Sequence, residues 1–427
     1  MKTNRRKFLS TAIAGSVTAA TLPLSACNSG IKEFDQQAEI KSRYAKLDEI
    51  LKQPVLKREL FTSPVIIESL ELLRLNNTFL CRVRSKDGAE GISVANDGQM
   101  RSLFAIFVTR LQPFFIGKDA RDLDKIVDDV YVYQSNYKMQ SLALWVPLAT
   151  IEFAILDMLG KMADKSFGQL IGEIHNPDIA VYWANGERGI SAELTVEHIK
   201  KSIEESQAKA LKFKVGGRMS NNFEEPQGRS EKLIPLIRKT FGDDMVIYAD
   251  SNGSYTADEA IRIGKIIEEY KFDMYEEPVP FDWYEETKEV ADALSIPIAG
   301  GEQEASIHAF RWLIANNAVD IVQQDMFYFG GMVRSMKVAR MAHAFGLQCT
   351  PHISPSGLGY VYMMHFVSSI PNAGPYHEFE GINTELPYEC KTSSLKSKDG
   401  VIKVPAGPGL GIEIDPAFIS KHHVVKA

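Results

Sequence analysis

Three acidic residues recur at one fixed interval along the chain: Asp250 in YADSNG, Glu276 in MYEEP and Glu302 in AGGEQ, with 276−250 = 26 and 302−276 = 26. Each follows a short apolar run, which predicts a strand end, and a strand with its helix takes roughly 25–30 residues. The interval therefore places three carboxylates at equivalent points of successive βα units, where they could hold a hard divalent cation such as Mg²⁺. The alternative is that each acid only caps the helix that follows it.

The same spacing continues beyond these acids, with Asp325, His352 and Glu378 at intervals of 325−302 = 23, 352−325 = 27 and 378−352 = 26. Eight strand-like runs alternate with helical stretches, at 179–184, 210–215, 245–250, 272–276, 296–302, 319–325, 347–352 and 375–379. Eight such runs predict an α/β fold with a (β/α)8-type (TIM) barrel, in which the strand ends converge on one mouth.

Two lysines lie on one expected strand, Lys212 and Lys214 in ALKFKVGG. Side chains two residues apart on a strand face the same way, so both should point into the barrel mouth. Two ammonium groups so close together disfavour each other's protonation, which should lower the pKa of at least one lysine toward a value useful for a base. Lys214 is the candidate for proton abstraction and Lys212 the candidate for holding a substrate carboxylate. A solvated lysine pair is the alternative.

Asp325 and His352 come from neighbouring strands, although a single histidine is more often structural. An aspartate that accepts from one imidazole nitrogen fixes the tautomer and raises the basicity of the other nitrogen, which leaves a general acid/base opposite Lys214. Glu378 ends the eighth strand and should face the developing enolate. If protonated, or helped by Lys212 and the metal, it could donate a hydrogen bond to that oxygen.

The order of these motifs, KxK, D-x-N, EEP, GE, Asp, PH and Glu, resembles the mandelate racemase group of the mandelate racemase/muconate lactonizing enzyme family, in the enolase superfamily. The stretch IEFAILDMLGKMADKSFGQLIG at 151–172 is similar to the helix-rich end of that family's capping domain, and GPGLGIEID at 407–415 to its C-terminal return. The resemblance covers about residues 60–416. It implies an α+β capping domain, whose loops, here 91–99 and 113–119, close over the barrel. The family often has Gly-Trp-Gly-Glu at the first loop, where this chain has GISVAND, so those substrate contacts cannot be carried over.

The chain is expected to divide into five parts: a signal peptide at 1–26, a tether and lead-in helix at 27–60, the capping domain at 61–177, the barrel at 178–389 and the C-terminal return at 390–427. In the capping domain we expect strands joined at an Asp87-Gly88 turn, and helices at 99–111, 119–131 and 148–163. Asp157 lies among the apolar residues of the last helix, and we interpret it as structural.

The joint chemistry is removal of a proton from a carbon next to a carboxylate. That proton is weakly acidic, so the site must stabilise a dianionic enediolate with a divalent cation and cationic side chains. If a hydroxyl sits on the next carbon, His352 can protonate it as it leaves, and the product is a 2-keto-3-deoxy acid. If nothing leaves, return of the proton on the other face inverts the centre.

We favour dehydration of an aldonic or aldaric sugar acid. Family members with a KxK base and a PH histidine are mostly acid-sugar dehydratases, and polar groups suited to a polyhydroxylated acid lie near the expected mouth: Asn185, Glu187, Arg188 and Arg218. The alternatives are a racemase, epimerase or cycloisomerase of the same intermediate, and a lipoprotein that only binds sugar acids. The presence of every expected catalytic and metal position opposes the last alternative.

The first residues indicate export. NRRKFLS at 4–10 and the uncharged stretch after it, too short to span a bilayer, resemble a twin-arginine signal peptide, although Asn4 stands where Ser or Thr is usual. LSAC at 24–27 resembles a lipobox, in which Cys27 would be acylated and become the mature N-terminus. The sequence therefore predicts a periplasmic or cell-envelope lipoprotein, held at the membrane by its lipid anchor alone, and more than one acyl chain would be needed for stable anchoring. The alternative is an unprocessed apolar N-terminus on a cytoplasmic enzyme.

Composition limits the remaining partners. A formal net charge of −7 argues against nucleic acid. The four cysteines, Cys27, Cys81, Cys349 and Cys390, show no CxxC spacing, so neither a zinc cluster nor a dense disulfide framework is indicated. The family resemblance implies a homo-oligomer.

Overall fold

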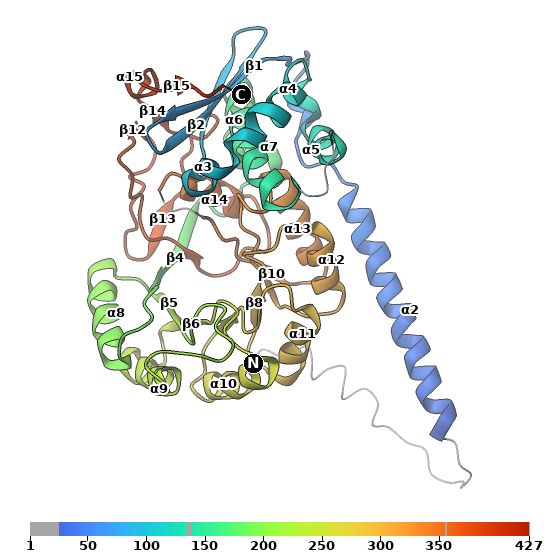
Figure 1. The fold of residues 1–427 in the computed structure, drawn as a ribbon, viewed down its shortest axis with the longest axis vertical. Coiled ribbons are helices and arrows are strands. Elements are labelled where there is room, and N and C mark those ends of the chain that lie inside the picture. The colour runs from blue at the N-terminus through green and yellow to red at the C-terminus, as the bar shows by residue number, and fades with distance from the viewer. Residues whose placement is uncertain (1–24, 135–138, 355–356, 427) are drawn as a thin grey trace.

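The protein is represented by a computed structural model, which describes residues 25–134, 139–354 and 357–426, with the backbone alone for 25–36. The expected signal peptide falls mainly on residues 1–24, which lie outside the described residues, and Cys27 falls in the first turn of helix α2 (Ser25–Leu51). An antiparallel sheet with its helices lies above a barrel of parallel strands (Figure 1).

The capping domain is built on a four-stranded antiparallel sheet in the order β15-β1-β2-β3. Its strands are β1 (Ile67–Leu75), β2 (Thr78–Ser85), β3 (Glu90–Val94) and β15 (His423–Val424). The expected Asp87-Gly88 turn joins β2 to β3, and Gly88 takes the left-handed φ of +89° that favours glycine. Val424 of β15 pairs with Leu73 of β1, so the C-terminus returns to this domain.

Helices occupy the three expected stretches of this domain. The first stretch holds α3 (Asp97–Ile106), which continues as a π-helical turn (Phe107–Leu111) and α4 (Gln112–Phe115). The second holds α5 (Leu123–Val132), and the third lies in α6 (Leu142–Ala163). The domain also contains α7 (Phe167–Ile171) and 3-10 turns at Arg58–Leu60 and Ala120–Asp122. α6 is long and apolar enough to cross a membrane, yet 89% of its apolar window is buried inside the protein. It packs against β2, β3 and α3, and so it is the core helix of this domain.

The second domain is a ring of eight parallel strands, as predicted. Their order is β11-β4-β5-β6-β7-β8-β9-β10, and a bridge between Cys349 of β10 and Ala373, shortly before β11, connects the two ends of the series. Each of the eight predicted runs coincides with one strand, and β4 begins one residue before its run: β4 (Asp178–Ala184), β5 (Ala210–Lys214), β6 (Val246–Asp250), β7 (Met274–Glu276), β8 (Ile298–Gly300), β9 (Ile321–Val322), β10 (Gln348–Cys349) and β11 (His377–Glu378).

Seven helices follow the first seven strands and cover the outside of the ring: α8 (Ala192–Ser206), α9 (Arg229–Phe241), α10 (Ala257–Glu269), α11 (Tyr284–Ala293), α12 (Ile307–Ala315), α13 (Met332–Ala344) and α14 (Gly359–Ser368). Strand alternation separates two sets of apolar side chains. Leu211 and Phe213 of β5 pack outward under the helices, whereas Tyr182 and Tyr248 belong to the small core inside the ring.

Helix α2 occupies most of the expected tether and lead-in helix at 27–60. Its C-terminal half lies against α12 and α13: Leu47 is fully buried, Arg43 donates to the Ile314 carbonyl at 2.8 Å, and Arg311 pairs with Asp48 at 2.6 Å. This segment is therefore a helix docked on the barrel, and its first turns extend past the barrel (Figure 1).

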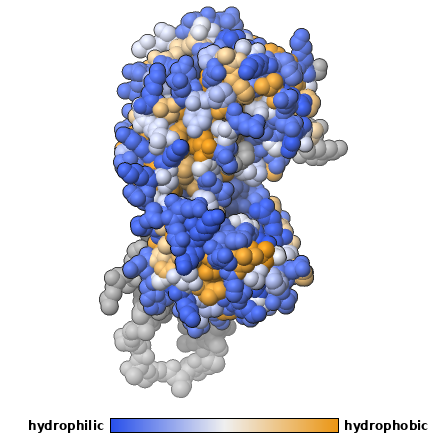
Figure 2. Space-filling view, turned by 90° about the vertical axis from the view of Figure 1, so that its left-hand side faces the viewer, coloured by the Kyte–Doolittle hydropathy of each residue, from blue (hydrophilic) through white to orange (hydrophobic). Residues whose placement is uncertain are grey.

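The C-terminal tail contacts both domains. β13 (Val401–Lys403) pairs antiparallel with barrel strand β4, β12 (Tyr388–Glu389) pairs with β14 (Glu413–Ile414), and α15 (Pro416–Ile419) leads to β15. The predicted domain boundaries stay a prediction. Seen from the side of α8, the surface is mainly hydrophilic and is hollowed at mid-height between two lobes (Figure 2).

Candidate active site

Three buried carboxylates meet at the carboxyl ends of neighbouring strands. Asp250 ends β6, Glu276 ends β7, and Glu302 lies just beyond β8. They are 0%, 0% and 4% exposed, and one oxygen of each lies within 4.8 Å of the other two. We call these three residues the carboxylate cluster. Buried oxygen donors at such distances could hold a divalent cation.

The alternative, that these acids cap the following helices, is wrong. Helix α10 begins at Ala257 after Thr256, α11 begins at Tyr284, and α12 begins at Ile307 with the Ser306 hydroxyl as its cap. The carboxylates thus face one another and not the helix ends.

Two lysines place positive charge beside the cluster, and both point to the same side of β5 as expected. The Lys212 Nζ lies 2.9 Å from Glu276 Oε1 and 3.0 Å from Glu378 Oε2, while Lys214 forms an ion pair with Asp250. Burial lowers the pKa of Lys212, but Glu276 and Glu378 outweigh burial and raise that pKa well above its ordinary value. Lys212 is therefore a fixed positive charge, and the expectation that at least one lysine of the pair has a lowered pKa stays a prediction.

The carboxylates of the cluster differ in their affinity for protons. Burial opposes ionisation of Asp250, but Lys214 and Lys212 outweigh it and hold the pKa of Asp250 well below its usual range. Burial, with Asp250 close by, raises the pKa of Glu276 to about 8. Lys212, whose Nζ lies 2.9 Å from Glu276 Oε1, lowers this pKa without cancelling the shift.

His352 and Asp325 form the expected hydrogen-bonded pair beyond the ends of β10 and β9. The His352 Nδ1 lies 2.7 Å from Asp325 Oδ2, and its Nε2 lies 3.7 Å from Glu302 Oε2. Burial lowers the pKa of His352, but Glu302 and Asp325 outweigh it and raise that pKa to about 10. The imidazole is therefore protonated at neutral pH, which suits a general acid, and it presents Nε2 to the carboxylate cluster.

Glu378 ends β11 and lies beside Lys212, within 3.1 Å of the Tyr182 hydroxyl that donates to it. Burial raises the pKa of Glu378, but Lys212 and His352 outweigh it and lower that pKa to about 2. The carboxylate is ionised, so the option that a protonated Glu378 donates a hydrogen bond is wrong for this arrangement. The Lys212 ammonium and the Tyr182 hydroxyl are the donors there.

The predicted substrate contacts divide into two groups. Arg188 and Arg218 both approach the cluster, since each points an Nη2 at the Asn252 Oδ1, at 2.9 and 3.5 Å. Asn185 instead donates to Glu187 at 2.9 Å, and Glu187 in turn contacts a histidine of α8. The roles of all these residues stay predictions.

Three residues near the cluster were not among the predicted site residues. Asn252 lies two residues after Asp250 in the D-x-N motif, and its Nδ2 reaches Glu302 Oε1 at 3.3 Å, so the motif could have revealed it. The Tyr182 hydroxyl contacts Glu378, as described above. Glu277 follows Glu276 on the strand, so strand alternation alone would turn it away from the barrel interior, but its φ of +41° breaks the alternation, and its carboxyl lies 3.5 Å from Asn252 Nδ2.

The two capping loops have different surroundings. In the loop at 91–99, Asn96 donates to the Ser354 carbonyl at 2.8 Å, just after His352. In the loop at 113–119, Gly117 and Asp119 bond to residues of the capping domain itself. The first loop is therefore the one that this structure places against the barrel beside the candidate acid.

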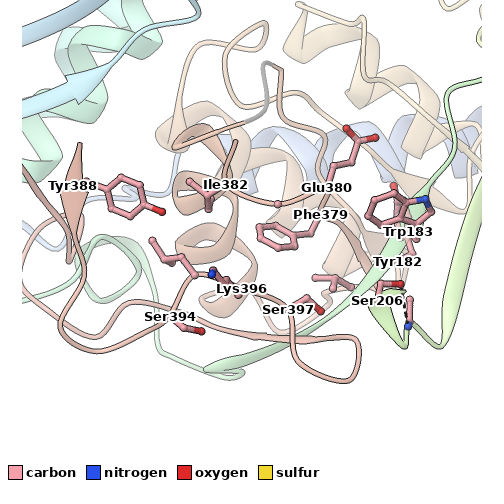
Figure 3. Close-up of a pocket in the computed structure, with 14 residues that line it drawn as sticks. Tyr182, Trp183, Ser206, Phe379, Glu380, Ile382, Tyr388, Ser394, Lys396 and Ser397 are labelled. Atoms are coloured by element: carbon pink, nitrogen blue, oxygen red, sulfur yellow. Dashed lines mark hydrogen bonds between the residues drawn. The ribbon is translucent and has the colours of Figure 1, made fainter. Parts of the chain in front are cut away.

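A cavity of about 320 Å³ lies next to the site, between β4 and the segment that follows β11. Figure 3 shows the Phe379 ring in its middle, between Trp183 and Tyr388. None of the three cluster carboxylates lines it, and Tyr182 connects it to Glu378. The chemistry described above therefore lies outside this cavity.

A family model described as enolase C-terminal domain-like matches residues 194–418. The chain belongs to the mandelate racemase/muconate lactonizing enzyme family of the enolase superfamily. The matched region begins in α8 and ends in the C-terminal tail, so it contains every residue of the carboxylate cluster, both lysines and the His352–Asp325 pair.

Relatives within this family include enzymes that act on sugar acids. The arabinonate dehydratase of Saccharolobus solfataricus is 26% identical over 71% of this chain and 79% of its own, and the D-galactarolactone cycloisomerase of Agrobacterium fabrum is 26% identical over 73% and 82%. The solved structure of a candidate racemase from Roseobacter denitrificans is 31% identical, covers 84% of this chain and 99% of its own, and has a TM-score of 0.76. The chain is thus an enzyme of the enolase superfamily.

Proposed function

We propose that this protein is a Mg²⁺-dependent dehydratase that converts an aldonic or aldaric sugar acid to a 2-keto-3-deoxy acid. The observation that carries the proposal is the placement of two proton-transfer groups at different carboxylates of one cluster. Lys214 pairs with Asp250, whereas the His352 Nε2 faces Glu302. A substrate carbon held between them would meet a candidate base and a candidate acid.

The carboxylate cluster fits a magnesium ion. Its three donors are carboxylate oxygens, which Mg²⁺ prefers, and they are buried within 4.8 Å of one another. Burial, with Asp250 close by, raises the pKa of Glu276, and a bound cation would offset both effects. When bound there, the cation would supply positive charge to a substrate carboxylate that gains negative charge as its α proton leaves.

The side chains then divide the work. Lys214, once it has given up the proton that it carries in its pair with Asp250, accepts the proton from the carbon next to the carboxylate, and Lys212, already a fixed cation, stabilises the resulting enediolate. Imidazolium His352 gives its Nε2 proton to the hydroxyl on the following carbon, so that the C–O bond breaks and water departs. Asp325 keeps Nδ1 protonated and the ring oriented. The remaining enol tautomerises to the 2-keto-3-deoxy acid.

Two alternatives use the same residues. A racemase, epimerase or cycloisomerase would need the same proton abstraction but no departing hydroxyl, and a cycloisomerase is among the relatives. A lipoprotein that only binds sugar acids would not need His352 protonated and paired at a buried aspartate. The His352 imidazole, held by Asp325 with Nε2 toward the carboxylate cluster, favours dehydration, because a departing hydroxyl needs an acid.

The test is a screen of the purified protein with Mg²⁺ against a library of aldonic and aldaric acids, with 2-keto acid formation as the readout. We expect turnover of at least one acid, loss of turnover in a chelator, and no turnover by Lys214→Ala. Inversion of a stereocentre or opening of a lactone without any 2-keto acid would replace dehydration by one of the alternatives.

We further propose that the chain is exported and lipidated at Cys27, and that it forms a homo-oligomer. Support for export comes from the paired arginines in NRRKFLS and from LSAC at 24–27. The helix that begins at Ser25 leads from this point to the barrel, so an anchor at Cys27 would be joined to the enzyme by α2.

A further inference from the structure

A buried carboxylate outside the active site joins the two domains. Glu152 lies in α6 of the capping domain and is 0% exposed. Its Oε1 accepts hydrogen bonds from the backbone N–H groups of Met332, at 2.5 Å, and Val333, at 2.9 Å, which are the first residues of α13. A capping-domain side chain therefore caps a helix of the barrel.

The surroundings of Glu152 are shaped for this contact. Gly331 takes a φ of +100°, and a Cβ atom there would lie 2.6 Å from the Glu152 carboxyl group. Met332 and Val333 are both 0% exposed, so water cannot replace the carboxylate as their acceptor. Burial raises the pKa of Glu152 to about 8, so the contact rests on the two hydrogen bonds and not on a negative charge at the helix N-terminus.

The N-terminus of α13, which Glu152 caps, is joined by a short loop to Asp325, the partner of the candidate acid His352. We call residues 325–331 the dyad loop. At its start, the Asp325 Oδ1 accepts from the N–H groups of Phe327, at 2.7 Å, and Tyr328, at 2.8 Å, while Oδ2 faces His352. At its end lies Gly331, next to the amides that Glu152 binds. Phe153, the neighbour of Glu152, packs edge-on against Phe327 with ring centroids 5.3 Å apart.

We propose that Glu152 is a positioning residue for the Asp325–His352 pair: it fixes the far end of the dyad loop and thereby the orientation in which Asp325 holds His352. The part of this inference that concerns activity rests on the proposed role of His352 as the acid. Without Glu152, two buried N–H groups lose their acceptor, an arrangement that folded proteins avoid. The dyad loop must then move to find new partners, and a shift of about 1 Å at a catalytic group costs on the order of 10²-fold in rate.

Helix α6 also supplies a matched control. Asp157 is 2% exposed and, like Glu152, accepts two backbone N–H groups, from Ile92 at 2.9 Å and Leu410 at 3.0 Å. These partners belong to β3 and to the C-terminal tail, and none belongs to the dyad loop. Asp157→Ala should therefore reproduce the loss of stability of Glu152→Ala without reproducing its effect on His352.

The experiment compares product formation with exchange of the substrate's α hydrogen in D2O. Exchange needs Lys214, whereas product formation also needs His352. Glu152→Ala should lower product formation about 10- to 100-fold, with KM changed little and exchange kept within a few-fold of the unmodified enzyme. Glu152→Gln, which keeps an acceptor oxygen, should restore most of the product formation. Asp157→Ala should leave the ratio of product to exchange unchanged.

A second readout does not depend on turnover. In protein labelled with ¹⁵N-histidine, the Nδ1–H signal of His352, assigned by its loss in His352→Asn, should shift or broaden in Glu152→Ala and stay in place in Asp157→Ala. If Glu152→Ala does not fold, Glu152→Asp can take its place. The aspartate side chain is shorter by one methylene group, so its carboxylate lies farther from the two N–H groups, and the same changes should appear in milder form.

Two outcomes would overturn the inference. One is a Glu152 variant that lowers the melting temperature while the product-to-exchange ratio and the His352 signal stay unchanged, which would make Glu152 structural only. The other is an equal effect of Asp157→Ala on both readouts. If the unmodified protein neither exchanges nor dehydrates any sugar acid, the proposed function fails, and the NMR signal alone still decides whether Glu152 positions His352.

Discussion

Replacing Lys214 and His352 separately should separate enolisation from loss of the hydroxyl. The structure gives the size of the penalty for using His352 as the base. With a pKa of about 10, only about one His352 side chain in 10³ is neutral at pH 7. Using His352 as the base would therefore add about 4 kcal/mol to the activation free energy of proton abstraction. A cation on Glu302 would reduce this penalty, because Glu302 is the carboxylate that raises that pKa most. His352 is therefore expected to give a proton, and Lys214, which pairs with Asp250, is the remaining candidate base.

The assay follows a substrate acid in D2O by proton NMR, with exchange of the α hydrogen and formation of 2-keto acid measured together. Lys214→Ala should abolish both. His352→Asn should lower 2-keto acid formation by about 10²–10⁴-fold, or about 2.7–5.4 kcal/mol, while exchange continues. Glu276→Gln is the control that should stop both processes, because it removes a proposed metal ligand.

Two results would refute this assignment. If His352→Asn stops exchange and Lys214→Ala does not, the roles of base and acid are reversed. If both variants dehydrate the acid at the normal rate, the reaction takes place elsewhere and the carboxylate cluster does not mark the active site.

Three shorter predictions concern the metal, the pH and the N-terminus. Glu276→Gln should weaken Mg²⁺ binding measured by calorimetry at least tenfold, and unchanged affinity would exclude Glu276 as a ligand. The pKa of Glu276 is about 8 in the folded, metal-free protein, whereas its ordinary value is 4.5. Between these values the folded state holds a proton that the unfolded state has lost, so the free energy of unfolding should fall as the pH rises from about 4.5 to about 8. Urea unfolding in a chelator should show this fall, and Glu276→Gln should flatten it; an equal fall in the variant would place the cause elsewhere. Palmitate labelling in cells should disappear in Cys27→Ser, and labelling that persists would disprove lipidation at that residue.

The barrel and the carboxylate cluster could be predicted from the sequence because both follow from chain length. A strand and its helix need a nearly constant number of residues, so strand-end acids spaced by that number must meet at one mouth. The pairing of Asp325 with His352 follows from the same rule, since their strands are neighbours. Short strands such as β9 and β10 were located by this spacing more than by any apolar pattern.

Other features depend on atoms that a residue pattern does not show. Glu277 turns toward Asn252 because of one left-handed backbone angle, and strand alternation alone places it on the opposite side. Glu152 has backbone amides as partners, 180 residues away, and every residue has a backbone amide. The raised pKa of Lys212 could not be predicted without knowing that Glu378 and Glu276 both contact its Nζ.

The charges of the assembled site explain why these groups belong together. Five carboxylates face three cationic side chains: Asp250, Glu276, Glu302, Asp325 and Glu378 against Lys212, Lys214 and His352. If all were ionised, the excess would be two negative charges, the amount that one divalent cation neutralises. In the absence of a cation, the raised pKa of Glu276 favours a proton on that carboxylate, which removes one of the two charges and which a cation would displace. The raised pKa of His352 keeps the third positive charge that the count includes. The same balance lets Lys212 stay charged beside Lys214, so that the electrostatic support for an enediolate is present before any substrate binds.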